Sequence, residues 1–314
     1  MNKIVLGILL LVFGVISLFV GNHDIALTDI FKMSDDQLLV FTISRIPRTL
    51  TLILCGMGIA VAGFLMQQLT QNRFVSPTTA GTLDAAKLGI LFGLIWVPQA
   101  GMLTRLALSV VFCFLASLIF LYFIRSIKSK DIILVPIIGI MFGSILNAFA
   151  TFFAVKYGIV QNVQDWLIGD FSGILQGQYE SIYLILPIVV LTYIFANRFT
   201  VISLGESFAK NLGLNYEVYL NIGILCVSLI VSATVVTVGA IPFLGLVIPN
   251  IIRIYKGDNM KAILPYTAMF GAVFLLFCDI LGRIIIAPYE VPIGLMVGIF
   301  GGIIFFGLLW RQKR

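Results

Sequence analysis

Charged side chains are scarce in this sequence of 314 residues. Asp, Glu, Lys and Arg together make up 11% of it, whereas soluble domains carry about 25%. Apolar residues make up 60%, and the mean hydropathy is +1.11. A water-soluble fold could not bury this much apolar surface, so we expect the solvent of the chain to be lipid. Because the apolar segments recur evenly from end to end, we predict one transmembrane domain over residues 1–314.

Residues that bind metals are few. The single histidine, His23, lies in a polar loop, where a lone imidazole is most often simply solvated. Each of the four cysteines lies inside an apolar run, and none has CxxC spacing. They are typical of small buried apolar residues and indicate neither a disulfide framework nor a zinc site. We therefore predict no metal site and no cofactor bound by this chain.

Catalytic motifs are missing as well. The sequence contains no GxxxxGK[ST], so the chain cannot bind the phosphates of ATP by itself. It contains no G-x-S-x-G and no H-E-x-x-H motif either, which makes a membrane-embedded enzyme the weakest of the candidate functions. The net charge of +6 does not indicate a nucleic-acid partner, because the basic residues lie in short loops between apolar runs.

Ten apolar segments come close to the roughly 17–25 residues that a helix needs to cross a bilayer. The sequence thus predicts an all-α, polytopic membrane protein with about ten transmembrane helices. The eighth segment is short and begins with Gly-Ala-Ile-Pro, which is typical of a broken or half-crossing helix. The predicted spans are residues 4–20, 46–69, 79–97, 103–124, 132–156, 181–196, 218–238, 240–254, 261–280 and 292–310.

The loop charges predict the orientation of these spans. When both termini are placed in the cytoplasm, most of the 20 Lys and Arg residues fall in cytoplasmic loops, as the positive-inside rule requires. The two longest polar stretches, residues 21–44 and 157–180, then lie outside. This orientation needs an even number of crossings.

Two charges lie inside a predicted span. Asp84 and Lys87 are three residues apart, so on a helix they share a face and neutralise each other. Charges within spans are costly and often functional. We interpret these two as a structural pair near the membrane edge, because they follow Pro77 by few turns. A transporter driven by a proton or sodium gradient would need more buried carboxylates, and it stays the alternative function.

The polar loop after the sixth predicted span contains an amphipathic stretch. Ser203 and Glu206 have the spacing of a capping box, and Gly213 suits the end of a short helix. On that helix Phe208 and Leu212 would form one apolar face in an aqueous loop. Exposed apolar faces of this kind mark partner sites, although a helix lying on the lipid surface is the alternative.

Five motifs follow one another along the chain. They are R-I-P-R-T-L at 45–50, G-F-L-M-Q-Q-L-T-Q-N-R-F-V-S-P at 63–77, L-G-E-S-F-A-K-N-L-G-L at 204–214, G-A-I-P-F-L-G-L-V-I-P at 239–249, and C-D-I-L-G-R with E-V-P-I-G at 278–283 and 290–294. In this order they resemble the motifs of the FecCD/vitamin B12-type permease family of ABC importers. The resemblance covers nearly the whole chain and implies the type II ABC importer permease fold.

The chain departs from the family pattern at four positions. The family's N-P-L-A is here Asn72-Arg73-Phe74-Val75, and the usual His after the fourth motif is Asn250. The form with Arg73, followed by T-T-A-G-T-L-D-A-A-K, resembles the branch that serves petrobactin- and anguibactin-like catecholate siderophores. We expect these substitutions to change the shape of the cytoplasmic gate and to leave the fold unchanged.

The resemblance implies the permease subunit of an ABC importer that moves a ferric siderophore across the bacterial cell (inner) membrane. This chain would not be an enzyme, because two separate cytoplasmic ATPase subunits would hydrolyse ATP. A second permease subunit, a paralogue, would complete the pathway, and a siderophore-binding lipoprotein or periplasmic protein would deliver the substrate. No residue of this chain would coordinate the iron, because the siderophore already does.

The resemblance also assigns roles to particular residues. Asn72 and Phe74 would lie at the cytoplasmic gate, at the inner end of a path lined by the fifth and tenth helices. The cytoplasmic coupling segment, about residues 203–215, would contact an ATPase through Gly205, Glu206, Phe208, Ala209, Leu212 and Gly213.

Three arginines are predicted to dock the binding protein. Arg45 and Arg48 straddle Pro47, and their i, i+3 spacing lets both side chains project from one face of the outer mouth. Arg283 follows the ninth predicted span and lies on the same side. The arginine fork can hold a carboxylate with two hydrogen bonds, so carboxylates of the binding protein are the expected partners. Anchoring to lipid headgroups is the alternative.

Overall fold

The computed structural model describes residues 2–21, 34–99, 101–127, 133–161 and 168–312. Every regular element within these residues is a helix, as the sequence predicts. The longer helices are α1 (Lys3–Phe19), α3 (Ile46–Leu69), α4 (Thr82–Trp96), α5 (Met102–Ser126), α6 (Leu134–Lys156), α8 (Ile185–Ile194), α11 (Tyr216–Val238), α12 (Leu244–Lys256), α13 (Met260–Ile284) and α14 (Ile293–Gln312). The shorter elements are α2 (Asp35–Val40), the π-helical η2 (Phe41–Arg45), the 3₁₀-helical η3 (Glu180–Leu184), α9 (Ala196–Ile202) and α10 (Glu206–Asn211).

Several of these helices can cross a membrane by length and composition. Five helical stretches of the described chain qualify on their own, and a sixth forms if η3 and α8 are counted as one span with α9, from which they are bent by 65°. α1 and the apolar part of α14 are shorter. The structure therefore supports a multi-pass membrane protein, and the total of about ten crossings stays a prediction. The five stretches are Asp35–Leu69, Met102–Ser126, Leu134–Lys156, Tyr216–Val238 and Met260–Ile284.

Two predicted spans begin later in the structure than in the sequence analysis. α12 starts only at Leu244, because Gly239 and Phe243 have positive φ angles of 82° and 59° and Pro242 has no N–H to donate. This segment is therefore helical only from Leu244, and its interpretation as a broken or half-crossing helix stays a prediction. α4 likewise starts at Thr82, after Gly81 turns the chain with a φ of 74°.

α3 is the central helix of the bundle. It is buried almost throughout, and it packs against α13, α11 and α12. Glycines permit the closest of these contacts: a Cβ added to Gly56 would lie 2.6 Å from the carbonyl oxygen of Gly271 on α13, and one added to Gly63 would collide with Gly245 on α12. Small residues allow helix backbones to approach in lipid, where no hydrophobic force drives association.

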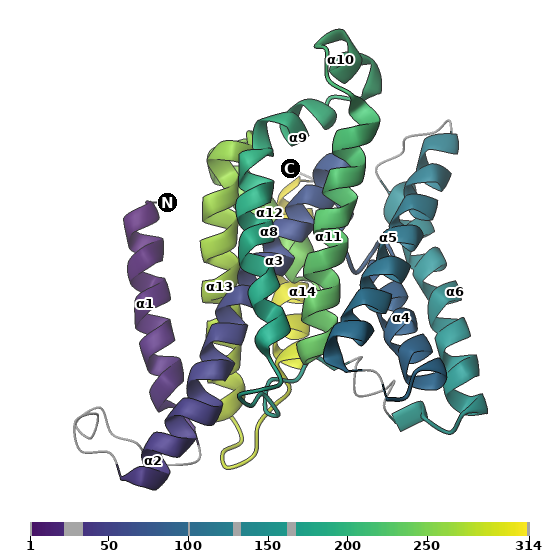
Figure 1. Ribbon diagram of the computed structural model, residues 1–314. Helices are drawn as coiled ribbons and strands as arrows, with labels where there is room; N and C mark the ends of the chain where they lie inside the picture. Colours follow the sequence, from purple (N-terminus) through teal and green to yellow (C-terminus); the bar gives the residue numbers. More distant parts are fainter. Residues whose placement is uncertain (1, 22–33, 100, 128–132, 162–167, 313–314) are drawn as a thin grey trace.

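The remaining helices lie on several sides of α3 (Figure 1). α4, α5 and α6 form a group on one side, whereas α1 lies on the opposite side against α13. The ends marked N and C lie toward the end of the bundle that carries α10, while α2 lies at the other end. The fold thus brings the loop after α3, the end of α12 and the last part of α14 together at the α10 end.

Candidate functional site

The loop that joins α3 to α4 is held in shape by its own polar groups. The side-chain Oδ1 of Asn72 accepts a hydrogen bond from the backbone N–H of Phe74 at 2.9 Å, and the N–H of Asn72 donates to the carbonyl of Gln67 at 3.1 Å. Gln71 turns the chain with a φ of 53°. The two predicted gate residues are therefore placed by one turn, with Asn72 fixing the backbone that carries the Phe74 ring.

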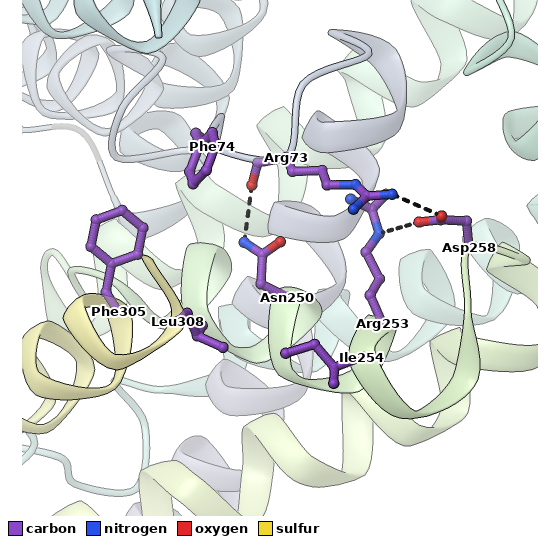
Figure 2. Close-up of a pocket in the computed structure, with 8 residues that line it drawn as sticks. All are labelled: Arg73, Phe74, Asn250, Arg253, Ile254, Asp258, Phe305 and Leu308. Carbon is purple, nitrogen blue, oxygen red and sulfur yellow. Dashed lines mark hydrogen bonds and ion pairs between the residues drawn. The ribbon is translucent and has the colours of Figure 1, made fainter. Parts of the chain in front are cut away.

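A cavity of about 100 Å³, here called the polar pocket, opens beside this turn (Figure 2). The ring of Phe74 meets that of Phe305 on α14 edge to face, with centroids 6.2 Å apart. Three separate parts of the chain build the pocket: the α3–α4 loop, the end of α12 with the turn that follows, and α14. Its lining residues are Arg73, Phe74, Asn250, Arg253, Ile254, Asp258, Phe305 and Leu308.

Two arginines share one carboxylate in the polar pocket. Arg73 Nη2 lies 3.0 Å from Asp258 Oδ2, and Arg253 Nε lies 3.1 Å from Asp258 Oδ1 (Figure 2). The Arg253 side chain is only 9% exposed, and its guanidinium lies over the ring of Phe64, 4.9 Å from the centroid. Arg73 and Asp258 are more than half exposed. The charged lining of the polar pocket therefore carries a net positive charge.

A larger cavity of about 500 Å³, the apolar cavity, shares two aromatic rings with the polar pocket. Phe74 and Phe305 line both spaces. Most of the other lining residues are apolar and come from α6 and the start of α12, so the wall offers almost no hydrogen-bonding groups. The other lining residues are Thr78, Thr79, Ile133, Pro136, Ile137, Ile140, Pro242, Phe243 and Leu246.

The predicted coupling helix exists as α10. Phe208 and Leu212 are 58% and 59% exposed, whereas Ala209 is buried and holds the helix against the bundle. Glu206 and Lys210 form an ion pair at 2.7 Å, and their hydrogen bond lowers the pKa of Glu206 and raises that of Lys210. The predicted apolar face on an exposed short helix is thus confirmed, and its partner stays a prediction.

The structure contradicts the predicted start of α10 and confirms its predicted end. The capping box is wrong, because α10 begins after Gly205, which has a φ of 106°, and the Ser203 hydroxyl instead donates to the Thr200 carbonyl at 2.7 Å. The stop at Gly213 is confirmed by its φ of 74° and by its N–H, which donates to the Lys210 carbonyl at 2.9 Å.

A third cavity, of about 260 Å³, lies between α10 and the α3–α4 loop. Glu206 of the coupling helix lines it together with Gln71 and Asn72 of the gate turn. Arg125 at the end of α5 also lines it and forms an ion pair with Glu217 at 2.8 Å. The coupling helix and the gate turn therefore face one shared space.

The three predicted docking arginines do not project from the outer mouth, so this part of the prediction is wrong. Arg45 and Arg283 are each 6% exposed. Arg45 donates to the carbonyls of Leu18 and Phe19 at 2.9 and 3.0 Å, and Arg283 donates to those of Ser17 and Val20 at 3.0 and 2.6 Å. These are carbonyls that the last turn of α1 leaves without helical partners, so arginines from η2 and α13 satisfy them.

Two acidic residues that the sequence analysis did not single out complete this cluster. Arg48 Nη2 lies 2.7 Å from Asp279 Oδ1, and Arg48 Nη1 lies 2.8 Å from Glu290 Oε2. Asp279 is fully buried and also pairs with Arg283 one helical turn later. The i, i+4 spacing of this pair is a signal that the sequence offered. Docking of a binding protein by these arginines stays a prediction.

The other side chains that the sequence predicted to be structural are the Asp84–Lys87 pair and the four cysteines. Lys87 and Asp84 pair at 3.4 Å, as predicted. All four cysteines are buried and free. No group of three or more potential metal ligands exists within the described part of the chain, and His23 lies outside it.

The comparisons with known proteins agree with this architecture. The model of the FecCD transport family matches residues 9–311, so the chain belongs to that family. A solved structure described as an inward-facing conformation of a metal-chelate type ABC transporter has the same fold, with a TM-score of 0.82, 23% sequence identity and 98% of each chain covered.

Three relatives are similar over nearly their full length. The petrobactin import system permease protein YclN of Bacillus subtilis is 48% identical, with 98% of each chain covered. The ferric-anguibactin transport system permease protein FatD of Vibrio anguillarum is 46% identical, with 95% of each chain covered. A vitamin B12 import system permease protein, BtuC of Citrobacter koseri, is 31% identical over 98% of this chain and 94% of its own.

Proposed function

We propose that this chain is the permease subunit of an ATP-driven importer that carries a ferric siderophore across the bacterial inner membrane. The observation that carries the proposal is the 46–48% identity, over nearly the whole chain, to permeases named for petrobactin and anguibactin import. In the bilayer the chain crosses about ten times, with both termini and α10 in the cytoplasm. The positive-inside bias of the loops supports this orientation.

The proposed importer needs partner subunits for ATP hydrolysis, for the other side of the pathway and for delivery of the substrate. Two cytoplasmic ATPase subunits hydrolyse ATP and receive α10, whose exposed Phe208 and Leu212 fit a groove as an amphipathic helix does. A second permease subunit, a paralogue, closes the other side of the pathway. A binding lipoprotein or periplasmic protein delivers the ferric siderophore, which needs no protein ligand for its iron. The turn with Asn72 and Phe74, together with Phe305, forms the inner gate.

Uptake into proteoliposomes tests the proposal against an ion-gradient-driven transporter. The complex is reconstituted with its ATPase, permease and binding-protein partners, and radio-iron ferric petrobactin is the probe. We expect uptake that requires ATP hydrolysis and continues in the presence of a protonophore. Uptake that stops when the ion gradient collapses, and that continues with a hydrolysis-deficient ATPase, would instead establish the secondary transporter.

A further inference from the structure

We propose that the polar pocket transiently binds an anionic group of a metal chelate whose body occupies the larger apolar cavity, with Arg73 and Arg253 as the groups that recognise its charge. This inference rests on the proposed function, because it assumes that a metal chelate passes along this face of the chain. It goes further by assigning the charge of the cargo and the residues that select it.

The first argument is that residues distant in the sequence meet at one place. Arg73, Phe74 and Asn250 all line the polar pocket, although Arg73 and Asn250 are 177 residues apart in the sequence. Asn250 Nδ2 donates to the Arg73 carbonyl at 2.9 Å, so the end of α12 holds the backbone that carries the Arg73 side chain (Figure 2). Their convergence indicates one site.

The second argument is charge. Asp258 gives one carboxylate oxygen to each of two guanidinium groups, so the pair of arginines is only half neutralised. A guanidinium carries five N–H donors, most of which stay available here for another acceptor. Arg253 is held in the wall by the Phe64 ring, whereas Arg73 is 57% exposed and can turn toward a ligand. One fixed and one adjustable cation suit an anion that binds and then leaves.

The third argument is that aromatic and cationic groups lie side by side. Phe74 and Phe305 line both the apolar cavity and the polar pocket. A chelate whose flat organic faces contact the two rings would therefore lie beside the arginines. Aromatic rings next to guanidinium groups match a ligand that is both aromatic and negatively charged, as a ferric catecholate complex is.

A purely mechanical reading of the same contacts exists, and charge variants separate the two. In that reading the bridge from Arg73 through Asp258 to Arg253 only fastens the gate turn to the end of α12. Arg73→Gln and Asp258→Asn would then have the same effect, because each breaks the same bridge. In a charge-recognition site their effects are opposite, because the first removes a positive charge and the second removes the competing negative one.

The experiment measures retention of two radio-iron probes on the permease–ATPase complex in nanodiscs: an anionic ferric catecholate and an uncharged ferric trihydroxamate. We expect Arg73→Gln to lower retention of the catecholate about tenfold, the lower end of the range over which a charged cleft raises the local concentration of counter-ions. Asp258→Asn should raise retention, and the double variant should return close to the parent. The trihydroxamate should respond to none of them.

Lys256→Gln is the matched control. It removes the same charge from α12 one turn beyond Arg253, but the Lys256 ammonium lies over the Tyr266 ring and does not line the polar pocket. Equal losses in Arg73→Gln and Asp258→Asn, no change in either, parental retention that ignores salt, or equal responses of the uncharged probe would each overturn the inference. Failure of the proposed function shows separately, as absence of ATP-driven uptake by the parent.

Discussion

Arg283 holds its guanidinium inside the protein, between the last carbonyls of α1 and the buried carboxylate of Asp279. A charge in such a place is stable only while its partners remain, because neither ion could otherwise leave water at acceptable cost. The cluster of Arg45, Arg48, Arg283, Asp279 and Glu290 therefore fastens α1 to α3 and α13. We infer that its first role is structural.

Arg283→Ala should destabilise the protein severely. The change leaves the α1 carbonyls unsatisfied and Asp279 with only Arg48, so we expect a loss of about 3–5 kcal/mol in the free energy of unfolding, as for other broken buried pairs. Thermal unfolding in detergent is the measurement, with the exposed Lys210→Ala as the control that should change little. A variant as stable as the parent would refute the structural role.

Phe74→Ala should make the gate leak. Removing the ring enlarges both the apolar cavity and the polar pocket, because Phe74 lines both and packs edge to face against Phe305. We expect passive release of a small fluorescent dye from proteoliposomes to rise about tenfold, a modest change in barrier of about 1.4 kcal/mol. Phe306→Ala is the control, since this neighbour on α14 lines neither cavity. Equal leak in both variants would contradict the gate assignment.

At the scale of elements, one face of α10 packs against the bundle and the other is exposed. Buried Ala209 and the Gly213 stop hold the helix on the bundle, while Phe208 and Leu212 stay in the open. The third cavity places Glu206 of α10 opposite the gate turn. The coupling helix and the turn that carries Asn72 are therefore neighbours across this cavity.

Phe208→Asp and Leu212→Asp should each release the ATPase. A carboxylate buried in a groove without a partner is costly, and we expect a loss of about 2–4 kcal/mol in binding free energy, typical of an interface anchor. Co-purification and ATP-driven uptake are the measurements. Asn211→Asp adds the same charge to α10 outside this apolar pair and should keep both. If both Asp variants still co-purify and transport normally, α10 lies on lipid instead.

At the scale of the whole molecule, α2 and α10 lie at opposite ends of the bundle (Figure 1). Labelling single cysteines in a background without the four native ones therefore tests the orientation. We expect an impermeant thiol reagent to label Asp35→Cys in cells whose inner membrane is intact and to leave Lys210→Cys unlabelled until the cells are opened. The reverse labelling pattern would mean that α10 faces outside and α2 faces the cytoplasm, contrary to the orientation predicted from the loop charges.

The coupling segment shows which structural features a local sequence pattern can predict and which it cannot. The i, i+4 spacing of Phe208 and Leu212 and the stop at Gly213 depend on neighbouring residues only, so they were predictable. The cap was not, because Ser203 belongs to the end of α9 and Gly205, with a φ of 106°, takes the position before α10. Which residue starts α10 depends on how the chain turns from α9 into α10, which no short pattern encodes.

The sequence by itself determined the lipid environment, the all-helical class and the family, because composition, apolar segment length and ordered motifs are properties of the chain alone. Only the tertiary structure decided which charges face inward. Arg48 meets Asp279 across 231 residues of sequence, and the polar pocket takes Arg73, Asp258 and Phe305 from three separate parts of the chain. A buried charge is stabilised by the partners that packing brings to it, and for these residues most of those partners come from distant segments.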